Sequence, residues 1–117
     1  MIPTPPRVLL ARDPIDLRKG IAGLAAICEV HLGEAPLDGT LFVFSSRDRR
    51  GVKMLVWTHG GFLMLYKRLE RGTFEVPSIG PDGAVKRELT PSELGLILEG
   101  VALDARPRRA RLGRSAS

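Results

Sequence analysis

The sequence predicts a small α+β domain with one mainly antiparallel β-meander sheet, packed by two helices in the order β-α-β-β-β-β-α. The 117 residues are the size of a single hydrophobic core. Short apolar runs separated by glycine-rich turns occupy the middle of the chain, and they are typical of strands. Two segments with helical start signals flank these runs, which favours helices that cover the sheet.

The first strand and the first helix are expected near the N-terminus, after a proline-rich lead-in. Val8–Ala11 is a short apolar run of the strand type. Asp13 is suited to the N-cap and Pro14 to the first helical position, so we predict a helix that ends near Leu32, with Gly33 after it. Four residues would share its buried face: Leu17, Ile21, Leu24 and Cys28.

Two glycines lie inside this predicted helix, where each costs up to about 1 kcal/mol relative to alanine. They are Gly20 and Gly23, close to Arg18 and Lys19. The simpler interpretation is close packing of the helix on the sheet. The alternative is that a partner backbone or a phosphate approaches the chain there.

Four meander strands are expected, at residues 41–44, 52–57, 62–69 and 74–76, with 85–89 in addition as an edge strand. The first is a continuous apolar run, as a central buried strand requires. The apolar residues of 62–69 fit a helix or a strand, and the meander context favours a strand.

The second helix has a capping-box signature, with Thr90 as N-cap, Pro91 at the first position and Glu93 at the third. We place its end near Gly100 and divide the chain into a domain at 1–104 and a disordered tail at 105–117. Five of the 18 basic residues lie in 106–117, where there is no acid, so the remaining chain carries 13 basic and 13 acidic residues. The net charge of +5 therefore belongs to the tail.

Composition and motifs argue against an enzyme, a cofactor or a metal site. The chain has no GxSxG elbow, phosphate loop, HExxH or CxxC motif. Its only soft metal ligands are Cys28, His31 and His59. Cys28 and His31 could share a helix face, but a zinc site needs four ligands or three plus water, so we interpret Cys28 as a buried thiol and His59 as a solvated loop residue. With one cysteine, no apolar run of membrane-spanning length and no signal-peptide layout, we expect a cytoplasmic protein without a membrane partner.

Basic residues are the better candidates for a function, because arginine and lysine contact phosphates. The candidate nucleic-acid-binding residues form a helix-start group, a loop group, a third-strand group and a tail group. They are Arg18 and Lys19; Arg47, Arg49, Arg50 and Lys53; Lys67, Arg68 and Arg71; and Arg106, Arg108, Arg109 and Arg111. The loop and third-strand groups could form one patch, or they could be solvated charges paired with Asp48 and Glu70. The six aromatic residues fit a core better than a base-stacking surface.

Four blocks in order resemble a known family. They are DLRKGIAGLAA at 16–26, GTLFVFSSRDRRGVKMLVW at 39–57, GFLMLYKRLERGTFEVP at 61–77 and TPSELGLILEG at 90–100. They are similar to the TnpB (Orf2-like) accessory proteins of the bacterial insertion-sequence-66 class. The arginine tail is not part of this family pattern.

The resemblance implies a non-catalytic accessory protein of DNA transposition, encoded beside a transposase, with DNA and that transposase as expected partners. The alternative is a protein-interaction scaffold or a homo-oligomer without direct nucleic-acid contact. The positions that match the family pattern are Arg18, Lys19, Gly20, Arg50, Lys53, Trp57, Lys67, Arg68, Leu69, Glu70 and Gly72.

Overall fold

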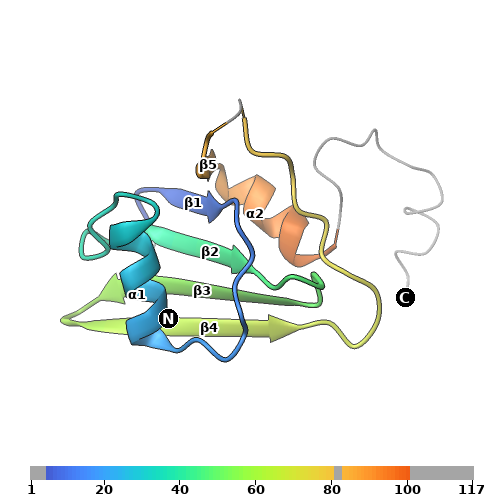
Figure 1. Ribbon diagram of the computed structural model, residues 1–117, viewed down its shortest axis with the longest axis horizontal. Helices are drawn as coiled ribbons and strands as arrows, with labels where there is room; N and C mark the ends of the chain where they lie inside the picture. Colours follow the sequence, from blue (N-terminus) through green and yellow to red (C-terminus); the bar gives the residue numbers. More distant parts are fainter. Residues whose placement is uncertain (1–4, 81–82, 101–117) are drawn as a thin grey trace.

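The computed structural model describes residues 5–80 and 83–100 of the chain. It contains the predicted order of elements (Figure 1): β1 (Val8–Ala11), α1 (Ile21–Val30), β2 (Leu41–Ser45), β3 (Gly51–Thr58), β4 (Gly61–Arg68), β5 (Lys86–Leu89) and α2 (Pro91–Leu98). The strands form one sheet in the order β4-β3-β2-β1-β5. β2, β3 and β4 are an antiparallel meander, β1 pairs with β2 in parallel, and β5 pairs antiparallel with β1.

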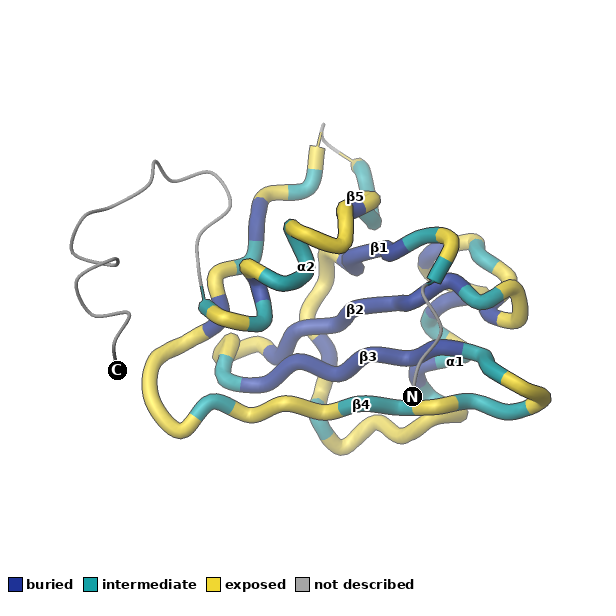
Figure 2. The backbone as a smooth tube through the Cα atoms, turned by 180° about the vertical axis from the view of Figure 1, so that it is seen from behind, coloured by how far each residue is buried: buried dark blue, intermediate teal, exposed yellow. Residues whose placement is uncertain are grey.

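The two helices lie on opposite faces of this sheet, as the opposite views of Figures 1 and 2 show. Alternate residues of β3 therefore enter different cores, with Leu55 on the α1 side and Val52 and Met54 on the α2 side. The central strands are buried (Figure 2), and their residues enter cores on both faces of the sheet. This two-sided burial explains why their sequences are continuous apolar runs.

The first helix begins later than the sequence indicates, so the prediction of a start at Asp13 and Pro14 is wrong. α1 begins at Ile21 with Gly20 as an N-cap that has no side-chain hydrogen bond. Residues 12–20 instead form a strap across the α1 face of the sheet. Ile15 anchors it, because its side chain is 7% exposed and its N–H donates to the carbonyl oxygen of Ser45 at 2.9 Å.

The predicted buried face of α1 is only half correct. Leu24 and Cys28 are fully buried between α1 and the sheet. Leu17 lies in the strap, and Ile21 is 39% exposed at the first turn. After the helix, Gly33 has a φ of +66°, which fits its predicted role in the turn that ends the helix.

The strand prediction holds for 62–69, where the structure has a strand rather than a helix, and for the edge strand β5. It is wrong for 74–76, where no strand forms. Phe74 is 1% exposed and its N–H donates to the carbonyl oxygen of Arg49, so this segment crosses the α2 face as a packed loop. The predicted capping box of Thr90 and Glu93 is present at α2.

Candidate nucleic-acid interface

Five arginines from two separate segments meet at one end of the sheet. Arg47, Arg49 and Arg50 lie in the loop between β2 and β3, and Arg68 and Arg71 lie at and after the end of β4. Two backbone hydrogen bonds join the segments: Leu69 N–H donates to the carbonyl oxygen of Arg50 at 2.9 Å, and Phe74 N–H donates to that of Arg49 at 2.7 Å. We call this group of five residues the arginine corner. The predicted loop and third-strand groups thus lie side by side.

An internal network fixes the loop that carries three of these arginines. The carboxylate of Asp48 accepts the Ser46 hydroxyl at 2.7 Å and the Arg50 N–H at 3.0 Å. The Ser46 hydroxyl oxygen also accepts the N–H of Gly51 at 3.0 Å. The hydrogen bond from Ser46 is the main cause that lowers the pKa of Asp48. Asp48 therefore serves the loop backbone, rather than pairing with an arginine side chain.

Arg49 has a φ of +60°, a left-handed conformation that disfavours residues other than glycine, asparagine and aspartate. Such strain, of order 1–2 kcal/mol, concentrates at functional positions. Two backbone hydrogen bonds hold this conformation: the Arg49 N–H donates to the carbonyl oxygen of Ser46, and the Arg49 carbonyl oxygen accepts from the N–H of Phe74.

Four of the corner arginines present their charge to solvent. Arg47, Arg49, Arg68 and Arg71 are exposed and form no ion pair within the described residues. Arg50 differs: it is half-buried, and its Nη2 atom lies 3.4 Å from the carbonyl oxygen of Glu70. Arg50 thus supports the junction of the two segments, while the other four form the surface.

The lysines predicted beside these arginines have other partners. Lys53 is 6% exposed, and its ammonium group donates to the carbonyl oxygens of Leu17 and Lys19 at 2.6 and 2.7 Å. The same group lies 5.4 Å from the centre of the Tyr66 ring, within range of a cation–π contact. It therefore tethers the strap to β3. We leave Lys53 out of the arginine corner for this reason.

Two more lysines form similar tethers. Lys67 on β4 donates to the carbonyl oxygen of Leu98 at the end of α2, at 2.9 Å. Lys86 on β5 donates to the carbonyl oxygen of Leu32, just after α1, and to Glu34. Lys86 is not among the residues for which we predict a function. No local signal reveals it, because its acceptors lie more than 50 residues away along the chain.

The predicted helix-start group lies in the strap. Arg18 is exposed but forms a close ion pair with Asp16, at 2.6 Å, and this contact holds the pKa of Asp16 far below its usual range. Asp16 and Arg47 line one shallow hollow, so the strap adjoins the arginine corner. The charge of Arg18 is therefore largely compensated, whereas its neighbour Lys19 forms no ion pair within the part of the chain that the structure describes.

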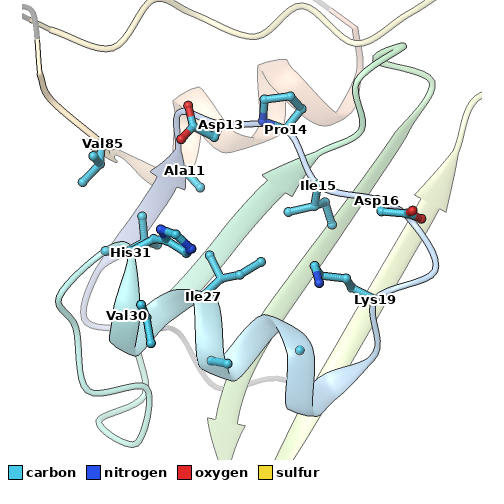
Figure 3. Close-up of a pocket in the computed structure, with 13 residues that line it drawn as sticks. Ala11, Asp13, Pro14, Ile15, Asp16, Lys19, Ile27, Val30, His31 and Val85 are labelled. Carbon is cyan, nitrogen blue, oxygen red and sulfur yellow. The ribbon is translucent and has the colours of Figure 1, made fainter.

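Lys19 lines a groove of about 480 Å³ between the strap and α1, with apolar walls that include Ile27 and Val30 (Figure 3). Gly23 also lines it, and the nearest atoms to an added Cβ there belong to the Lys19 side chain, at ordinary contact distance. No atom lies within 4 Å of a Cβ added at Gly20. The interpretation that Gly20 and Gly23 allow close packing of the helix on the sheet is therefore wrong.

Cys28 and the histidines do not gather into a metal site within the described residues. Cys28 is fully buried, and this burial raises the pKa of its thiol to about 12. His59 lies in the turn between β3 and β4 with a φ of +49°. The interpretation of Cys28 as a buried, unreactive thiol fits this environment.

The aromatic residues are mostly core. Phe42, Phe44 and Phe74 are at most 1% exposed. Trp57 and Phe62 pack edge to face across β3 and β4, with ring centres 4.9 Å apart. Tyr66, on β4, is the exception at 48% exposure. The arginine corner consequently lacks a row of aromatic rings on which bases could stack.

The fold and the corner define a small α+β protein with a cationic end. Residues 6–108 match the family described as IS66 Orf2 like protein, and the chain belongs to this family. The match reaches into the stretch that we predict to be a tail. The family is one of non-catalytic accessory proteins of transposition. The four predicted tail sites, Arg106, Arg108, Arg109 and Arg111, lie outside the described residues.

Two relatives come from Sinorhizobium fredii, and both are described as uncharacterized proteins. The chain is 32% identical to y4jC over 95 residues, which cover 81% of this chain and 79% of the relative. It is 38% identical to y4hO over 96 residues, covering 81% and 80%. No solved structure matches. Within the described residues, no helix is both long and apolar enough to cross a membrane.

Proposed function

We propose that this protein assists transposition in the bacterial cytoplasm by binding the DNA of its element, with the arginine corner on the phosphate backbone. The observation that carries the proposal is the convergence of Arg47, Arg49, Arg68 and Arg71 at one end of the sheet, all exposed and without ion pairs among the described residues. Guanidinium groups bind phosphate oxygens in a planar, bidentate manner.

The geometry favours backbone contact over the recognition of base sequence. The corner is formed by a loop and a strand end. None of its arginines lies on a described helix that could enter the major groove of DNA. The strained backbone of Arg49 supports a role for its side chain, because glycine would fit that position with less strain. The five tail arginines would add sequence-independent affinity.

A salt series of DNA binding tests the proposal. We compare the full chain with a variant carrying Arg68→Gln and Arg71→Gln. We expect the slope of log K against log salt to flatten by roughly two units, about one for each lost phosphate contact. The matched control carries Arg7→Gln and Arg12→Gln, which removes the same charge from arginines paired with Glu34 and Asp13. Equal slopes for the two variants would exclude the corner as the DNA contact.

A chain that ends at Asp104 separates the domain from the tail. We expect this shortened chain to bind DNA more weakly but to retain the difference between the corner and control variants. If binding disappears with the tail, DNA contact belongs to the tail alone. The transposase is the second expected partner, and its capture in high salt, unaffected by the corner substitutions, would favour the protein-interaction scaffold.

A further inference from the structure

β4 is an edge strand whose outer side has no strand partner within the described residues. It is eight residues long and ends only at the corner, so the exposed edge is long and regular. Leu63 is 36% exposed and Tyr66 is 48% exposed on this strand. Long, apolar edge strands of this kind pair with other chains unless something blocks them.

The opposite edge of the sheet is protected. β5 has only four residues, and two of them carry charges tied to other segments. Lys86 contacts Glu34, and Arg87 contacts Glu93 at 3.2 Å. Short length and charge are the usual ways in which proteins block an edge. β4 has neither protection along its first five residues, which are apolar apart from Gly61.

The register shows which backbone groups are available. β3 and β4 are joined by a two-residue turn at His59 and Gly60, both with positive φ, and Thr58 is paired with Gly61. In such hairpins the pair beside the turn is hydrogen-bonded, and the bonds then recur at every second residue. The bond from Leu69 N–H to Arg50 continues this alternation. The outward backbone groups are therefore those of Phe62, Met64, Tyr66 and Arg68.

We propose that two copies of the protein pair through β4, antiparallel, and join their sheets into one. The strand is self-complementary in this orientation, because its apolar half, 62–66, would meet the same half of the second copy. Lys67 and Arg68 of each copy would lie beside the β3–β4 turn of the other copy, far from Lys67 and Arg68 of that copy. A parallel pair would bring the two arginine corners together, and like charges would oppose it.

Sedimentation equilibrium of the nuclease-treated full chain in about 0.5 M salt tests the pairing without a contribution from DNA. We expect a mass that rises with concentration from 12.8 kDa to twice that value. Leu63→Lys places a charge within the paired strands and is expected to weaken dimerisation at least about tenfold. Leu96→Lys is the matched control, because Leu96 is 38% exposed on α2 and lies on another element.

Hydrogen exchange locates the interface independently of any substitution. The amides of Phe62, Met64 and Tyr66 are expected to become protected as the concentration rises. Met64→Pro removes an outward backbone donor and also a half-buried side chain that packs on the α1 side of the sheet. It should abolish this protection, and circular dichroism of the same variant checks that the fold remains.

Three outcomes would overturn the proposal. The first is a monomer at all concentrations with rapid exchange at these amides. The second is a dimer that Leu63→Lys and Leu96→Lys weaken equally. The third is protection of the amides only after transposase is added, which would assign the edge to that partner.

Discussion

The lysines of the sheet and the arginines of its corner carry the same charge, but they differ in what they contact. Lys53, Lys67 and Lys86 each donate to a backbone carbonyl oxygen of a segment that packs on the sheet. The exposed corner arginines form no ion pair within the described residues. An ammonium group on a flexible stem suits a single carbonyl oxygen, whereas a planar guanidinium suits a phosphate. We infer that the three sheet lysines stabilise this fold, and we propose that the exposed corner arginines bind its partner.

The largest effect that we expect from this comparison is at Lys53. Lys53→Met removes two charge-assisted hydrogen bonds and leaves the carbonyl oxygens of Leu17 and Lys19 without their donor, which should lower the free energy of unfolding by about 2–3 kcal/mol. Urea denaturation measures this change. Arg71→Met, which also removes one cation, should change it by less than about 0.5 kcal/mol. Similar losses in both variants would contradict the division of roles.

A smaller effect is expected at Glu34, which contacts Arg7 at 2.7 Å and also contacts Lys86. The hydrogen bond from Lys86 is the main cause that lowers the pKa of Glu34 below its ordinary 4.5. Its contribution to stability is thus fully present above about pH 4.5 and is lost as the pH falls through the lower folded-state value.

We expect Glu34→Gln to cost about 1 kcal/mol at neutral pH and to flatten the loss of stability below pH 4.5, as thermal unfolding at a series of pH values would show. Glu88→Gln is the control, because Glu88 is exposed on β5 and forms no ion pair within the described part of the chain. If Glu88→Gln flattens the pH profile equally, the ion pairs of Glu34 are not its source.

The smallest change in stability, and the most informative, is expected at Arg49. Arg49→Gly relieves a φ of +60°, so we expect the free energy of unfolding to stay within about 0.5 kcal/mol or to rise. The same substitution should weaken DNA binding and flatten its salt slope by about one unit. Denaturation and binding measured on one preparation separate the two effects. Unchanged DNA binding would show that the Arg49 side chain does not contact the DNA, and its strained backbone would then have no explanation in binding.

Local signals predicted the local features of this fold. The capping box at Thr90 and Glu93 spans one helical turn, so a local sequence signature is enough to predict it. The contact of Arg87 with Glu93 does not disrupt it. The central strands β1, β2 and β3 were predictable because burial on both faces requires continuous apolar runs. The start of α1 was not predictable from the sequence. Ile15 pairs with Ser46, a residue about 30 positions further along the chain, and this pairing keeps the strap out of the helix.

The candidate site divides in the same way. The sequence indicated that the two arginine groups could form one patch, and backbone hydrogen bonds from 69 and 74 to 50 and 49 bring them together. It did not reveal that Lys53 and Lys67 are tethers, because their acceptors are 36 and 31 residues away. A basic residue in a sequence therefore indicates a binding surface only where its side chain does not donate to the carbonyl oxygen of a distant segment.

The position of β1 between β2 and β5 has a consequence for synthesis of the protein. Its four residues are all buried, yet one of its neighbours, β5, is translated after every other strand of the sheet. On the ribosome, β1 therefore has one unpaired edge until residue 89 has emerged. A gene cut short before that codon would yield an aggregating or degraded chain, not a partly active one.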